Sequence, residues 1–169
     1  MFHLKAIELI AKSLRGAVEN TDAGREGMAL GQYIAGMGFS NVGLGIVHSM
    51  AHPLGAFYDT PHGVANALLL PYIMEYNAES PSRAKYLDIA KAMGVNTEGM
   101  SVDEGVKAAI DAVRALSLSI GIPQHLNEIG VKKEDIPALA VAAFNDVCTG
   151  GNPRPTSVED IEALYHTAF

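Results

Sequence analysis

The sequence contains a single cysteine, Cys148, and no tryptophan. One cysteine excludes an internal disulfide, and sparse cysteine is typical of a reducing compartment, so we expect a cytoplasmic protein. Charged residues make up only 18% of the 169 residues, and the formal net charge is -7 at pH 7. A nucleic-acid-binding surface needs clustered lysine and arginine, so this balance argues against a nucleic-acid partner.

Long hydrophobic runs are also absent. The most apolar run, residues 67–74, is interrupted by Pro71 and is far shorter than the ~20 residues that a membrane helix needs. Residues 1–5 lack the charged-then-apolar pattern of a signal peptide. We therefore expect no membrane partner. Hydrophobic residues make up 49% of the chain, which is enough for the core of one domain and leaves apolar surface for a protein partner.

Apolar residues recur at helical spacing along almost the whole chain, and no segment has the pattern of a strand. Helix starts are predicted by Asp22, by Ser80 followed by Pro81, and by the capping-box patterns at Ser101 and Ser157. The sequence therefore predicts an all-α fold, a multi-helix bundle in a single domain over residues 1–169. The expected helices are 7–14, 22–37, 44–57 (disturbed near Pro53), 62–77 (kinked at Pro71), 80–93, 101–120, 134–147 and 157–167.

Three of the six histidines, His48, His52 and His62, lie in one apolar, glycine-rich stretch. His48 and His52 are four residues apart, so a helix projects both from one face. A turn containing Asp59 separates them from His62, and a helix hairpin would bring His62 to His48. Clustered imidazoles are common metal ligands, whereas a single histidine is more often a hydrogen-bonded core residue. The spacing alone leaves both interpretations open, and Asp59 is either a turn residue or a further metal contact.

Residues 45–56 and 61–66 together resemble the signature of iron-containing (group III) alcohol dehydrogenases. The resemblance extends through residues 36–41 and 148–154 and covers essentially the whole chain. It implies the all-helical, metal-binding C-terminal domain of a two-domain, NAD-linked enzyme. In that family a divalent metal, Fe(2+) or sometimes Zn(2+), polarises the substrate carbonyl for hydride transfer.

The same resemblance implies roles for individual residues. It makes His48 and His62 metal ligands. It makes His52 a non-ligand histidine that faces both cofactor and substrate, with a catalytic and a cofactor-binding role. Phe39 and Cys148 are implied to lie near the substrate pocket. From its sequence alone the segment around Cys148 is a plain connection between helices.

The resemblance further implies that the family's nucleotide-binding domain and two other metal ligands, an Asp and a His, precede the first residue of this chain. We therefore expect the metal-binding domain of an enzyme for small aldehydes or alcohols, with little activity and no NAD binding by the chain alone. Two alternatives remain open. The chain is one half of a split enzyme completed by a separate nucleotide-binding chain, or it is a non-catalytic helical module that forms homo-oligomers.

Overall fold

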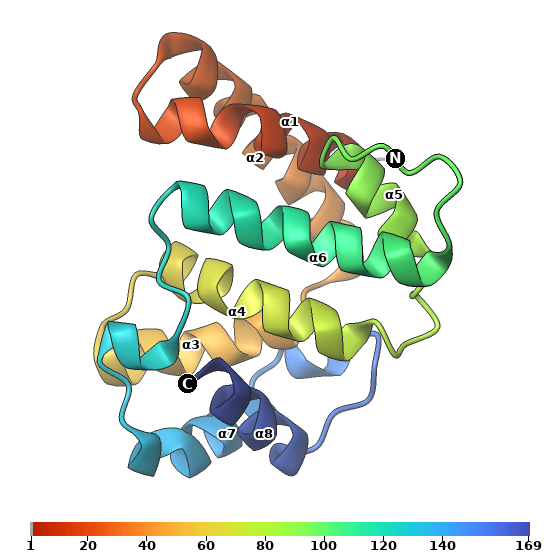
Figure 1. Cartoon of the computed structure of the whole chain (residues 1–169). Coiled ribbons are helices and arrows are strands. Elements are labelled where there is room, and N and C mark those ends of the chain that lie inside the picture. The colour runs from red at the N-terminus through yellow and green to blue at the C-terminus, as the bar shows by residue number, and fades with distance from the viewer. Residues whose placement is uncertain (1) are drawn as a thin grey trace. The chain divides into compact units, whose positions relative to one another are not determined.

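The computed structural model describes residues 2–169, and every regular element in this part of the chain is helical (Figure 1). This confirms the predicted all-α fold class. Three short 3-10 helices connect the longer ones: η1 (Leu126–Ile129), η2 (Lys133–Asp135) and η3 (Thr149–Gly151). The α-helices of residues 2–169 are α1 (Phe2–Val18), α2 (Asp22–Val42), α3 (Ile46–Tyr58), α4 (His62–Asn77), α5 (Lys85–Ala92), α6 (Val102–Ser119), α7 (Ile136–Phe144) and α8 (Val158–Ala168).

The contacts divide the chain into two compact units, and each unit is discontinuous in sequence. Unit 1 combines the chain up to Gly43 with Ser82–Ile120, and unit 2 combines Leu44–Pro81 with Gly121–Phe169. The α1–α2 and α5–α6 pairs pack within unit 1, while α3, α4, α7 and α8 pack within unit 2. The single domain expected over residues 1–169 stays a prediction.

Helix α2 begins at Asp22 as expected, but it ends at Val42, beyond the expected end at Met37. Thr21, not Asp22, is its N-cap, and the Thr21 side chain accepts a hydrogen bond from the Gly24 backbone N–H at 3.2 Å. The prediction of Asp22 as the cap was wrong, because the hydroxyl of Thr21, one residue earlier, accepts the hydrogen bond from that N–H. Asp22 instead occupies the first turn, where its charge suits the positive end of the helix dipole.

Glycine allows α1 and α2 to approach closely. A Cβ atom on Gly24 would lie 2.2 Å from the carbonyl carbon of Gly16. A Cβ on Gly31 would lie 3.0 Å from the side chain of Ile10. Gly36, on the same helix, has nothing within 4 Å of such an atom. Only some of the small residues of α2 are therefore required for packing.

The predicted helix start at Ser80–Pro81 was also wrong. Residues 81–84 form turns, and α5 begins only at Lys85. Ser80 is buried, and its backbone N–H donates to the Asn77 carbonyl at 3.0 Å. Ser80 therefore belongs to the turn that follows α4, and the N-cap of α5 is Ala84.

The two predicted capping boxes are confirmed. The Glu104 backbone N–H donates to the Ser101 hydroxyl at 3.3 Å, and the Ser101 backbone N–H donates to the Glu104 carboxylate at 2.7 Å. Ser157 and Asp160 repeat this reciprocal arrangement at the start of α8, with distances of 3.1 and 2.9 Å. Each box satisfies backbone donors that a helix start leaves without partners.

Unit 2 surrounds a core built from α3, α4, α7 and α8. Tyr165 is fully buried, and its hydroxyl donates to the Met50 carbonyl at 2.6 Å, which ties α8 to α3. Both α3 and α4 continue through their internal prolines, Pro53 and Pro71, which are themselves buried. The largest fully buried apolar side chains of this core are Ile46, Met50, Leu54, Leu69, Ile73, Leu126, Ile136, Leu139, Ile161 and Tyr165.

Across residues 2–169, no helix combines the length and the apolar character that a bilayer crossing requires.

Candidate metal centre

Helices α3 and α4 bring three imidazoles together within unit 2. His48 and His52 lie one turn apart on α3, and His62 is the first residue of α4. The His48 and His62 ring centroids are 5.5 Å apart, those of His52 and His62 are 5.4 Å apart, and those of His48 and His52 are 6.3 Å apart. The expectation of a helix hairpin that brings His62 to His48 is therefore confirmed.

The hairpin depends on a left-handed residue at the end of α3. Asp59 has a φ of 55°, and its backbone N–H donates to the Gly55 carbonyl at 3.1 Å. Aspartate tolerates this conformation better than most residues, because its short polar side chain can hydrogen-bond locally. Of the two roles left open by the sequence, the structure assigns Asp59 the turn.

The three imidazoles differ in their surroundings. His48 is the most enclosed, and burial, followed by the nearby His62 and His52, lowers the pKa of its ring below the usual value. The neutral form is therefore favoured, which is the form that binds a metal. The His52 side chain is 41% exposed.

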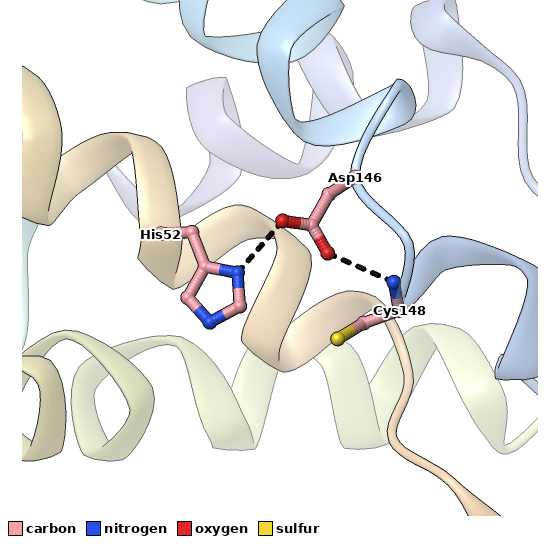
Figure 2. Close-up of side chains that lie close together, drawn as sticks. All are labelled: His52, Asp146 and Cys148. Atoms are coloured by element: carbon pink, nitrogen blue, oxygen red, sulfur yellow. Dashed lines mark hydrogen bonds and ion pairs between the residues drawn. The ribbon is translucent and has the colours of Figure 1, made fainter.

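A carboxylate and a thiol lie beside His52 (Figure 2). Asp146 Oδ2 is 2.7 Å from His52 Nδ1, and Asp146 Oδ1 accepts the backbone N–H of Cys148 at 2.8 Å. In Figure 2 the second ring nitrogen of His52 points away from the carboxylate. Burial alone raises the pKa of the Asp146 carboxyl, but the hydrogen bonds from Cys148 and His52 outweigh it and hold the pKa below its usual value. Asp146 therefore faces His52 as a carboxylate.

His62 has a partner on its own helix. The Asn66 side-chain Nδ2 donates to the His62 carbonyl at 2.9 Å and lies 3.1 Å from His62 Nε2. Asn66 Oδ1 is buried and has no hydrogen-bond partner among the described residues. A buried acceptor without a partner is costly, so Asn66 Oδ1 is free to accept a hydrogen bond from a group that binds at this end of α4.

The connection that carries Asp146 and Cys148 is fixed at both ends. The Thr149 hydroxyl donates to the Ala143 carbonyl at 2.7 Å, which closes the connection onto α7. The guanidinium of Arg154 lies 3.9 Å from the centre of the Tyr76 ring and donates to the Tyr76 carbonyl at 2.9 Å. The segment predicted as a plain connection is therefore a loop that side-chain contacts fix to α7 and α4.

The structure brings four of the five predicted site residues into one neighbourhood of unit 2: His48, His52, His62 and Cys148. Phe39 belongs to unit 1, where it lies on α2 and is 45% exposed. Its assignment to a substrate pocket stays a prediction, as do the functional roles of the other four.

Sequence reasoning missed Asp146 and Asn66. Asn66 lies four residues after His62 on one helix, so the spacing could have identified it. Asp146 is separated from His52 by 94 residues, and no local pattern marks it.

The whole chain, residues 1–169, matches the family model described as the C-terminal part of the Fe-containing alcohol dehydrogenase family. The chain therefore belongs to that family. It is 66% identical to a lactaldehyde reductase of Escherichia coli K12 over 168 residues, which cover 99% of this chain and 44% of the relative. It is 47% identical to a 1,3-propanediol dehydrogenase of Citrobacter freundii, covering 98% of this chain and 43% of the relative. The chain thus spans less than half the length of these relatives.

Solved structures agree with the fold. A 1,3-propanediol oxidoreductase superposes with a TM-score of 0.95 at 46% identity, covering 98% of this chain and 44% of that one. An alcohol dehydrogenase of Oenococcus oeni gives a TM-score of 0.94 at 41% identity, with the same coverage. The fold expected from the family resemblance is therefore confirmed.

Proposed function

We propose that this chain is the metal-binding part of an iron-dependent, NAD-linked alcohol dehydrogenase that interconverts small aldehydes and alcohols. The single observation that carries this proposal is the convergence of His48, His52 and His62, with ring centroids 5.4–6.3 Å apart. The similarity to a lactaldehyde reductase and a 1,3-propanediol dehydrogenase supports short, hydroxylated aldehydes as the substrate class.

His48 and His62 are the residues that would hold the metal. Imidazole nitrogens suit Fe(2+) and Zn(2+), and the favoured neutral state of His48 matches the form that binds them. The spare acceptor of Asn66 beside His62 fits a site that receives a group from outside. A metal bound there would act as a Lewis acid toward a substrate carbonyl.

His52 is the proposed proton donor. The Asp146 carboxylate accepts a hydrogen bond from the Nδ1–H of His52, so that Nε2 is the nitrogen that exchanges a proton with the substrate oxygen. In aldehyde reduction the doubly protonated ring would give its Nε2 proton to the substrate oxygen, and the neutral ring would keep its Nδ1 proton, which donates a hydrogen bond to Asp146. Alcohol oxidation reverses this transfer. Cys148 lies beside this pair, since its backbone N–H donates to the other oxygen of Asp146.

The nucleotide is not assigned to this chain. Residues 2–169 contain no strand, so they do not form the glycine-rich strand–helix turn that binds a dinucleotide pyrophosphate. In the proposed activity NAD would be held by a nucleotide-binding domain such as the family enzymes have, and His52 would face it. Homo-oligomerisation, or completion by a separate nucleotide-binding chain, stays a prediction.

Calorimetry on the metal-stripped chain tests this proposal, with Fe(II) added under anaerobic conditions. We expect binding that His48→Ala and His62→Ala each weaken at least tenfold, about 1.4 kcal/mol. His166→Ala is the matched control, since His166 is an exposed histidine in the last turn of α8. No binding by the parent chain, or equal binding by all variants, would contradict a metal site at His48 and His62.

A further inference from the structure

A second group of metal-binding side chains lies next to the proposed centre. Its members are His52, Asp146 and Cys148, an imidazole from α3 and a carboxylate and a thiol from the loop after α7. One donor atom from each lies within 4.8 Å of the other two. Figure 2 shows the three side chains converging, with the sulfur on the same side of the loop as the imidazole.

The geometry points to a separate zinc site formed by His52, Asp146 and Cys148. Zn(2+) accepts this mixture of nitrogen, oxygen and sulfur ligands, whereas Mg(2+) and Ca(2+) require mostly oxygen. Three protein ligands leave the fourth tetrahedral position open to water. This inference does not require the catalytic role of His52, although zinc bound at His52 Nδ1 would displace the proton that the proposed function places there.

The adjustments needed to bind zinc are small. Zinc–ligand bonds of about 2.0–2.3 Å place tetrahedral ligand atoms roughly 3.3–3.6 Å apart. The Asp146–His52 pair, at 2.7 Å, must open by less than about 1 Å, and no pair of donor atoms is farther apart than 4.8 Å. Side-chain torsions alone provide such shifts, and the backbone N–H of Cys148 keeps Asp146 in place meanwhile.

The local electrostatics favour a cation. Burial and the neighbouring Asp146 raise the pKa of the Cys148 thiol, because a second negative charge beside the carboxylate is unfavourable. A divalent cation removes this penalty, since it neutralises both groups and deprotonates the thiol it binds. The 41% exposure of His52 and the 18% exposure of Asp146 leave the group accessible to a metal from solution.

Cobalt(II) absorption spectroscopy under anaerobic, reducing conditions tests this site on the chain itself. Thiolate bound to Co(II) produces an intense near-ultraviolet charge-transfer band, which nitrogen and oxygen ligands do not produce. Cys148 is the sole cysteine, so a thiolate band reports on this residue alone. We expect the band in the parent chain, with stoichiometric displacement by Zn(II).

Variants separate this site from the proposed centre. Cys148→Ser is expected to abolish the band, and Asp146→Asn and His52→Ala are each expected to raise the Co(II) Kd at least tenfold. His48→Ala and His62→Ala are expected to retain the band, even if the test of the proposed function fails. Circular dichroism establishes that each variant is folded.

Two results would overturn the zinc site. One is Co(II) binding without a thiolate band, which would place the metal on the histidines alone. The other is a band that depends on Cys148 but not on His52 or Asp146 and appears with dimers in sedimentation, because the metal would then bridge two copies.

Discussion

Asn77 and Asn152 hydrogen-bond to each other through both of their side-chain amides. Asn77 Nδ2 donates to Asn152 Oδ1 at 3.0 Å, and Asn152 Nδ2 donates to Asn77 Oδ1 at 2.8 Å. The pair joins the last residue of α4 to the loop that carries Asp146 and Cys148. The loop thus gains a specific register against the helix that begins with His62.

Replacing Asn152 by aspartate tests this pair. Asn152 Nδ2 also donates to the Arg154 carbonyl at 2.7 Å, so the variant sets a charged oxygen against two acceptors. We expect Asn152→Asp to lower the free energy of unfolding by about 1–3 kcal/mol, measured by urea denaturation. Asn127→Asp makes the same change at an exposed site and should cost less than about 0.5 kcal/mol. Equal denaturation midpoints for the two variants would contradict a structural role for the amide pair.

The hydrogen bond from His52 to Asp146 sets the tautomer of His52. We expect nitrogen-15 NMR at a pH where the ring is neutral to find the proton mainly on Nδ1. In Asp146→Asn the ratio of the Nδ1–H tautomer to the Nε2–H tautomer should fall several-fold, because a charge-assisted hydrogen bond is lost. Such a bond contributes about 1.5–3 kcal/mol when it is buried, and the 41% exposure of His52 reduces that contribution. The exposed His166 provides the reference signal, which the substitution should leave unchanged. A parent His52 with its proton on Nε2 would rule out the proposed orientation.

Two glycines of α2 should respond in opposite ways to alanine. Gly24→Ala forces a Cβ into the backbone of α1 at Gly16, and we expect a loss of stability near the upper end of about 1–3 kcal/mol. Gly36→Ala meets no atom within 4 Å and should instead stabilise by about 0.5–1 kcal/mol, because the helix loses a flexible residue. Thermal unfolding of both variants measures the difference. A stabilising Gly24→Ala would show that α1 and α2 do not pack as closely as described.

The contribution of Asp160 to the capping box of α8 should depend on pH. The Ser157 backbone N–H and hydroxyl both donate to Asp160 and lower the pKa of its carboxyl. A carboxyl whose native pKa is lowered stabilises the fold above its unfolded pKa of about 3.9, and this stability is lost as the pH falls through the native value.

Asp160→Asn is therefore expected to cost about 1 kcal/mol at pH 7 and progressively less below about pH 4. Denaturant titrations at several pH values measure this difference. Glu159→Gln lies in the same first turn but outside the box, so its effect should be smaller at pH 7. A cost of Asp160→Asn that does not change with pH would mean that the charge is irrelevant to the cap.

Local chemistry made most of the helices predictable. The capping boxes at Ser101 and Ser157 use residues three apart, so each start could be identified from a few neighbours. Ser80 misled because the same residue type can cap a new helix or complete an old one. Tertiary packing decides between them, and here it buries Ser80 at the end of α4.

Only part of the candidate site was predictable from the sequence. His48 and His52 share a helix face, and a short turn returns the chain to His62, so spacing alone brings the imidazoles together. Asp146 meets His52 only through the packing of α7 against α3. A contact between such distant segments leaves no signal in either sequence, and the grouping of His52, Asp146 and Cys148 became visible only in three dimensions.

The discontinuity of unit 2 fixes an order of events on the ribosome. His48, His52 and His62 are translated 84 to 100 residues before Asp146 and Cys148, an interval on the order of ten seconds at typical elongation rates. During that interval the three imidazoles are available to a metal without the carboxylate of Asp146 or the thiol of Cys148. In the two proposed sites the thiol and the carboxylate would therefore reach a metal after the histidines, so the time of exposure, as well as affinity, would govern which metal the finished chain carries.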